Sequence, residues 1–103
     1  MIKHIVMWKL KEHAEDNDKA GNAILVKEKL EAMVNLVPGM ITLEVGIDLG
    51  MDASGFDVVL YSEFENKEAL AAYQAHPEHK AVFPFIGAVR ELRTAVDYFI
   101  DNE

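Results

Sequence analysis

Cysteine is absent from this chain, and basic residues, proline and tryptophan are scarce. Without cysteine there is no disulfide, no thiolate metal site and no cysteine nucleophile. Ten basic residues against eighteen acidic ones give a formal charge of −8, which argues against nucleic acid or an anionic membrane as partner. The first apolar run is interrupted by Lys3, His4 and Lys9, which excludes a signal peptide or a membrane span there. We therefore expect a cytoplasmic protein.

The chain does have enough apolar material for one core. Half of its 103 residues are hydrophobic, and this length fits a single domain over residues 1–103. Part of that apolar share can also serve a dimer interface.

Alternation of apolar and polar residues predicts four strands. The first strand would place His4 in the core, on the same face as Val6 and Trp8. The last three residues, 101–103, are expected to form a frayed tail. The four strands are expected at about 2–11, 40–49, 56–64 and 89–99.

Helical spacing fills the gaps between these strands. Apolar residues at steps of three and four predict a helix over about 19–37, with its cap at Asp16 or Asn17. Pro38 and Gly39 would end that helix.

Two further helices are expected in the second half of the chain. The first covers about 67–75 and is capped by Asn66, and a short one follows from Pro77 until Pro84 discourages it. The order β-α-β-β-α-(α)-β is that of a ferredoxin-like α+β protomer, with one antiparallel sheet and helices on one side. The uncovered sheet face looks too apolar for water, which favours a homodimer formed sheet to sheet. Its apolar members are expected to be Ile5, Met7, Val59, Tyr61 and Phe99.

The seven residues from Tyr73 to His79 read YQAHPEH and are the best candidate for chemistry. They hold a tyrosine and two of the four histidines around Pro77. Proline moves the preceding residue out of the helical region and suits the first position of the next helix. The three-residue spacing can then bring Tyr73, His76 and His79 to one side of a helix corner.

Each candidate also has a purely structural interpretation. His4 can be a core histidine bonded to a backbone carbonyl, or a base facing His79. His76 can cap or shape the corner. Tyr73 can stabilise a developing enolate, or be a half-buried aromatic whose hydroxyl reaches water. Trp8 can pack in the core or, with Phe83 and Phe85, form an apolar wall.

Three segments resemble the stress-responsive A/B barrel (Dabb) family, over about residues 1–99. They are KHIVMWKLK at 3–11, FDVVLYSEF at 56–64 and YQAHPEH at 73–79. The resemblance implies a dimeric α+β barrel of two ferredoxin-like protomers. Some plant members are polyketide cyclases that perform an intramolecular aldol condensation, and their key groups match His4, Tyr73 and His79. A further histidine of that branch falls at about Val58, so this chain lacks it.

The enzyme hypothesis is a cofactor-independent cyclase or lyase acting on an apolar, carbonyl-bearing, polyketide-like ligand. His79 would remove a C–H proton, Tyr73 would stabilise the enolate, and His4 would orient or assist. No metal is expected, because no carboxylate obviously converges with the histidines. The alternatives are a non-catalytic dimer that binds a small hydrophobic molecule in a stress response, and a monooxygenase or haem-degrading relative. The pocket is expected to be lined by Trp8, His76, Val58 and Phe83.

Overall fold

The computed structural model describes residues 1–100, so the predicted tail at 101–103 lies outside it. Its first strand, β1 (Ile2–Leu10), alternates between buried and more exposed side chains along its whole length. His4, Val6 and Trp8 are buried on one face, as the alternation predicts. This face of β1 lines one side of the cavity described below.

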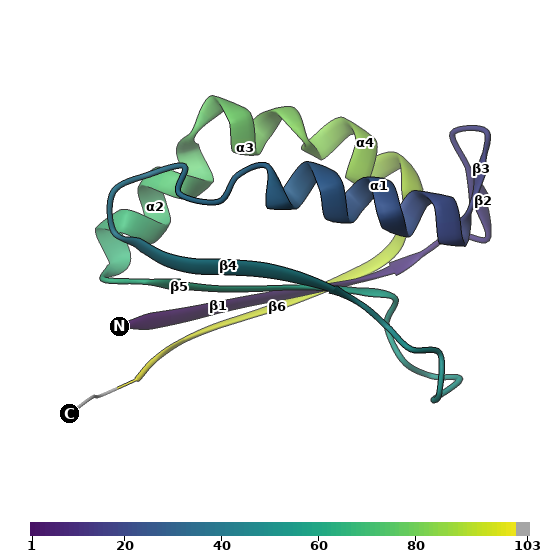
Figure 1. Cartoon of the computed structure of the whole chain (residues 1–103), viewed down its shortest axis with the longest axis horizontal. Helices are drawn as coiled ribbons and strands as arrows, with labels where there is room; N and C mark the ends of the chain where they lie inside the picture. The colour runs from purple at the N-terminus through teal and green to yellow at the C-terminus, as the bar shows by residue number, and fades with distance from the viewer. Residues whose placement is uncertain (101–103) are drawn as a thin grey trace.

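The main sheet has four strands in the order β4-β5-β1-β6, and every neighbouring pair is antiparallel. The other strands are β4 (Met40–Ile47), β5 (Val58–Phe64) and β6 (Arg90–Phe99). Figure 1 shows the helices on one side of this sheet. The ferredoxin-like α+β fold is therefore confirmed. Within residues 1–100, no helix has both the length and the apolar character needed to cross a membrane.

The first helix, α1 (Lys19–Glu31), is shorter than predicted. The backbone leaves the helix at Ala32, and Asn35 has a φ of 61°, in the left-handed region that interrupts a helix. Apolar spacing continues to Val37, which is buried, but its side chain reaches the core from a turn. Periodicity alone did not distinguish these two cases.

The predicted cap of α1 at Asp16 or Asn17 was also wrong. The preceding residues form a small hairpin of β2 (His13–Ala14) and β3 (Asn17–Asp18). The cap is therefore Asp18, whose side chain accepts a hydrogen bond from the Gly21 N–H at 2.8 Å.

Three short helices follow β5 and lie on the same side of the sheet as α1 (Figure 1). The first is α2 (Lys67–Ala75), capped by Asn66 as predicted. It is followed by α3 (Pro77–Ala81) and α4 (Phe83–Val89). α3 ends before Pro84, as predicted, but Pro84 then lies in the first turn of α4, a helix that was not predicted. Proline lacks only an N–H that the first turn leaves unpaired.

The sheet face opposite the helices carries a mixed apolar surface. Leu92, Val96 and Tyr98 are between 40% and 52% exposed there. Phe99 was predicted on this face, but it pairs directly with the buried Ile2 and so belongs to the helix side, at its edge. Val96, which lies opposite Ile5 in the β1–β6 register, is on the helix-free face, where Phe99 had been expected.

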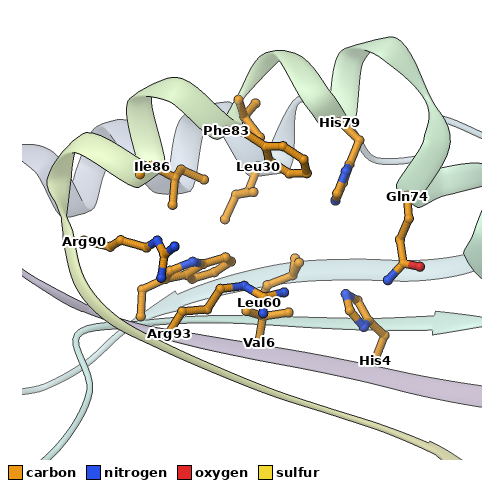
Figure 2. Close-up of a pocket in the computed structure, with 13 residues that line it drawn as sticks. His4, Val6, Leu30, Leu60, Gln74, His79, Phe83, Ile86, Arg90 and Arg93 are labelled. Atoms are coloured by element: carbon orange, nitrogen blue, oxygen red, sulfur yellow. The ribbon is translucent and has the colours of Figure 1, made fainter.

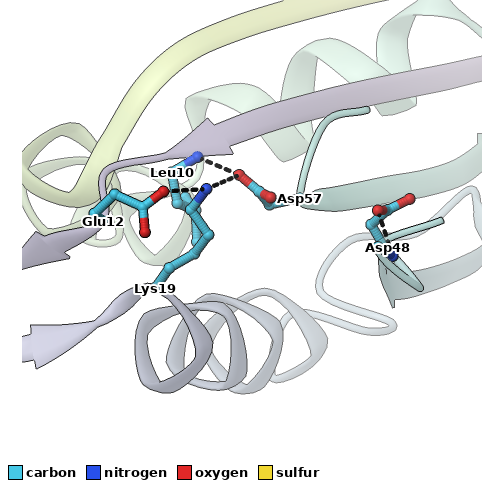
Figure 3. Close-up of polar contacts among 6 residues, drawn as sticks. Leu10, Glu12, Lys19, Asp48 and Asp57 are labelled. Carbon is cyan, nitrogen blue, oxygen red and sulfur yellow. Dashed lines mark hydrogen bonds and ion pairs between the residues drawn. The ribbon is translucent and has the colours of Figure 1, made fainter. Parts of the chain in front are cut away.

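Polar contacts join the end of β1 to the neighbouring elements (Figure 3). A side-chain oxygen of Asp57 accepts a hydrogen bond from the Leu10 N–H at 2.7 Å, and the Lys19 ammonium lies 3.6 Å from the same oxygen. Lys19 is also 3.2 Å from the Glu12 carboxylate. These contacts link the start of α1 to the loop after β1 and to the residue before β5.

Candidate active site

A cavity of about 410 Å³ lies between the helices and the sheet. Figure 2 shows side chains from β1 and β6 below it and from α3 and α4 above it. Its volume is near the lower end of the range for small-molecule sites, about 300–1,000 Å³. The apolar lining consists of Val6, Trp8, Leu30, Leu60, Val82, Phe83 and Ile86. The polar lining consists of His4, Gln74, His79, Arg90 and Arg93.

His4 enters the cavity from β1 and is almost fully buried. Its Nδ1 contacts the Oδ1 atom of Asp97, which faces it directly in the β1–β6 register. A carboxylate only accepts hydrogen bonds, so Nδ1 carries the proton and Nε2 is left able to accept one. His4 is therefore buried, as the structural interpretation expected, but its hydrogen-bond partner is the Asp97 carboxylate and not a backbone carbonyl.

His79 reaches the same cavity from α3, on the opposite side (Figure 2). Burial and the nearby His4 lower the pKa of His79, while the backbone carbonyl of Gln74 acts in the other direction. Nδ1 of His79 is buried and has no hydrogen-bond partner of normal geometry within residues 1–100. The imidazole is therefore neutral near pH 7, with a polar atom still to be satisfied.

Tyr73 lies behind the two histidines. Its ring centroid is 4.6 Å from that of His79 and 6.4 Å from that of His4. The side chain is fully buried, and its hydroxyl has no hydrogen-bond partner in the described part of the chain. Burial raises the pKa of this phenol to about 12, so it stays protonated. Tyr73 does not line the cavity, and its ring packs edge-on against both histidines.

Of the four predicted ligand-binding residues, Trp8 and Phe83 line the cavity and the other two do not. His76 instead caps α3, because its Nδ1 accepts a hydrogen bond from the Glu78 N–H at 3.1 Å. Val58 is buried in the core, and Leu60, two residues further along β5, lines the cavity in its place.

The sequence interpretation missed Asp97, Gln74 and the two arginines. Asp97 and Arg93 share one face of β6 by simple alternation, but only the register places them opposite His4 and Trp8. The signal that was available is composition, since the chain has two arginines and both line this cavity.

The Stress Responsive A/B Barrel Domain family, Dabb, matches residues 2–100. The chain belongs to this family. It is 31% identical over 105 residues to the stress-response A/B barrel domain-containing protein DABB1 of Arabidopsis thaliana, covering 99% of this chain and 48% of that protein. This A/B barrel chain thus spans about half the length of that curated relative.

Solved structures show the same fold. A dimeric protein of unknown function with a ferredoxin-like fold from Bacteroides fragilis is 31% identical, with a TM-score of 0.76 and coverage of 96% of this chain and 95% of that chain. A hydroxynitrile lyase from Passiflora edulis is 20% identical, with a TM-score of 0.75 and coverage of 99% and 94%. The lyase therefore shares the fold of this chain.

The cavity of this A/B barrel domain combines proton acceptors with apolar walls. The imidazoles of His4 and His79 both line this cavity, and an imidazole can take up or deliver a proton near pH 7. A ligand that fills the cavity replaces water with apolar walls, which strengthens the polar interactions it makes there. The arrangement can therefore bind a small molecule and is equipped for proton transfer to or from it.

Proposed function

We propose that this A/B barrel protein is a cofactor-independent lyase or cyclase that moves a proton on a small, carbonyl-bearing ligand. The observation that carries the proposal is that His4 and His79, 75 positions apart in the chain, line one mostly apolar cavity. One of these imidazoles is further oriented by a carboxylate. Such a pair serves acid–base chemistry better than packing alone.

The environments of the two histidines favour different roles. Asp97 stabilises the imidazolium that His4 becomes on taking a proton, so His4 is the better general base. The surroundings of His79 disfavour its charged form, which suits a neutral hydrogen-bond donor to the ligand carbonyl. His4 thus takes the role of base that the sequence suggested for His79, and His79 takes the enolate-stabilising role suggested for Tyr73. Tyr73 becomes a positioning residue.

The proton balance is simple. His4 Nε2 takes the proton from the carbon next to the carbonyl, and the electron pair moves to the carbonyl oxygen as an enolate. His79 donates a hydrogen bond to that oxygen. In a cyclase the enolate carbon then adds to a second carbonyl carbon of the ligand, and the imidazolium of His4 gives its proton to the resulting alkoxide. A lyase runs the same steps in reverse: His4 takes the hydroxyl proton, the carbon–carbon bond breaks to leave the enolate, and the imidazolium of His4 protonates the enolate carbon. No electron is gained or lost, so no redox cofactor is required.

We also propose that the protein acts as a homodimer formed through the helix-free sheet face. The apolar side chains on that face and the dimeric state of the Bacteroides fragilis relative support this assembly.

The first prediction tests proton removal without knowledge of the product. The protein should accelerate hydrogen–deuterium exchange at the acidic C–H of 1,3-dicarbonyl compounds in D₂O, measured by NMR. His4→Gln should lower the enzyme-dependent exchange rate by about 10²–10⁴-fold. Asp97→Asn should lower it by about tenfold or more, because the amide no longer stabilises the imidazolium.

His13→Gln is the matched control, since His13 is exposed on β2 and outside the cavity. Its exchange rate should equal that of the wild type. Tyr73→Phe should retain most of the rate, because the hydroxyl does not line the cavity. Equal exchange by wild type and His4→Gln would contradict the enzyme proposal. Tight ligand binding without exchange would identify a non-catalytic binding protein instead.

A further inference from the structure

The two arginines of this acidic chain both line the cavity. Arg90 and Arg93 are its only arginines, and no lysine, aspartate or glutamate is among the lining residues. Within residues 1–100 neither arginine forms an ion pair, because the ion pairs there involve His4, Lys19 and Lys27. Two cations without a carboxylate partner therefore gather at one site of a protein whose formal charge is −8.

An irregularity in β6 brings the two arginines to the same side of the sheet. Residues three apart on a regular strand point to opposite faces. The β1–β6 register, however, shifts between Lys9 and Leu10: Leu92 pairs with Lys9, and Arg90 pairs with Leu10. Glu91 is the extra residue of this bulge. Arg90 thus faces the helix layer together with Arg93, and bulges often re-aim side chains beside functional sites.

The cavity has two chemically distinct ends. Figure 2 shows Arg90 at one end and His4, His79 and Gln74 at the other, with Arg93 extending from the Arg90 end toward the middle. The charge of Arg93 reaches the other end, because it contributes to lowering the pKa of His79. An anion held by Arg93 would therefore also act on the proposed proton-transfer groups.

We infer that the ligand is a small molecule with an anionic headgroup, bound by Arg93 and Arg90, and an apolar or aromatic body that reaches the histidines. This inference rests on the proposed function in using the same cavity. Guanidinium groups bind carboxylate and phosphate oxygens through paired N–H donors, whereas the apolar walls accept the rest of the molecule. Such binding places the reacting carbonyl beside His4 and His79.

Binding of matched probes tests the inference. The probes are 3-phenylpropanoate, 2-phenylethyl phosphate and the neutral 3-phenylpropanamide. Trp8 is the only tryptophan and lines the cavity, so its fluorescence reports occupancy. The wild type should bind at least one of the two anions about 10- to 100-fold more tightly than the amide. The stronger anion identifies the headgroup as carboxylate or phosphate.

Variants of the two arginines test whether these residues cause the tighter binding of anions. Arg93→Gln should remove most of the anion preference and leave amide affinity unchanged, which also shows that the cavity is intact. Arg93→Lys should retain part of it, because the charge remains but the paired donors do not. Lys80→Gln removes the same charge from an exposed site outside the cavity and should bind as the wild type does.

The outcomes separate the two proposals. Equal affinity of the wild type for the anions and the amide would overturn the anionic ligand, while the cavity would remain a binding site. An anion preference that survives in the Arg90→Gln/Arg93→Gln double variant would overturn the assignment to these residues. Failure of all three probes to change Trp8 fluorescence would overturn the inference. The proton-exchange assay tests the proposed function independently.

Discussion

At the scale of single residues, the site depends on imidazoles held in unequal surroundings. His4 is paired with a half-exposed carboxylate, whereas Nδ1 of His79 is buried without a partner within residues 1–100. Burial and neighbouring positive charge lower the pKa of His79. The folded protein therefore disfavours protonation of His79 more than the unfolded chain does.

This difference predicts a pH dependence of stability. Between the lowered pKa of His79 in the folded state and its ordinary value of 6.5, the unfolded chain binds more protons. The free energy of unfolding should therefore fall as the pH drops below about 6.5. His79→Gln should reduce this dependence, as measured by urea unfolding at a series of pH values from 7.5 to 5.

Other groups titrate in the same range, so the comparison needs a control. His13→Gln removes an exposed histidine outside the cavity and should keep the pH profile of the wild type. Identical profiles for His79→Gln and the wild type would show that the fold does not disfavour the charged imidazole.

At the scale of elements, close approach between segments sets the position of α2. Gly39 precedes β4 with a φ of 89°, a backbone conformation that residues with a side chain rarely adopt. A Cβ atom at this position would lie 2.7 Å from the Cβ of Ala69, in α2. The absence of a side chain at Gly39 thus lets α2, which carries Tyr73 and Gln74, pack against the start of β4.

Gly39→Ala should lower the free energy of unfolding by about 2–4 kcal/mol, from the left-handed backbone and the overlap together. Guanidinium unfolding measures this. Adding Ala69→Gly should restore the steric part alone, so the two changes should not be additive. Gly87→Ala is the control: it lies in α4 with open space around its Cβ position, and it should be neutral or stabilise by up to about 1 kcal/mol. A loss below about 1 kcal/mol for Gly39→Ala would contradict this account of the packing.

At the scale of the whole molecule, one face of the sheet remains uncovered in a single chain. Val96 and Leu92 are about half exposed, and Val96 lies directly opposite Ile5 in the sheet. A soluble monomer rarely exposes a contiguous apolar face of this kind. The proposed homodimer would bury these side chains against the same face of a second copy.

Val96→Asp should shift the protein from dimer to monomer, because it places an unpaired charge in the proposed interface. Light scattering after size-exclusion chromatography measures the mass directly. Ile24→Asp is the matched control, since Ile24 is also 52% exposed but lies on α1, away from this face. A dimer that persists in Val96→Asp, or a monomeric wild type, would contradict the proposed assembly.

Local sequence patterns predicted much of the fold. The alternation in β1 placed His4, Val6 and Trp8 in the core, and Asn66 was identified as the cap of α2. These features depend on neighbouring residues, so they could be inferred without tertiary contacts. The end of α1 was missed, because a buried residue in a turn has the same apolar spacing as one in a helix.

The sequence by itself determined the strand and helix order, the helix corner at Pro77 and the gathering of His76 and His79 beside it. Only the tertiary structure decided which of these side chains meet. The β1–β6 register paired Asp97 with His4, and the bulge at Glu91 placed both arginines on the cavity side of the sheet. The packing around Tyr73 buried its hydroxyl outside the cavity lining. The physical reason is that periodicity fixes the face on which a side chain lies. Its partner, in contrast, depends on strand register and layer spacing, which arise from contacts between segments far apart in the chain.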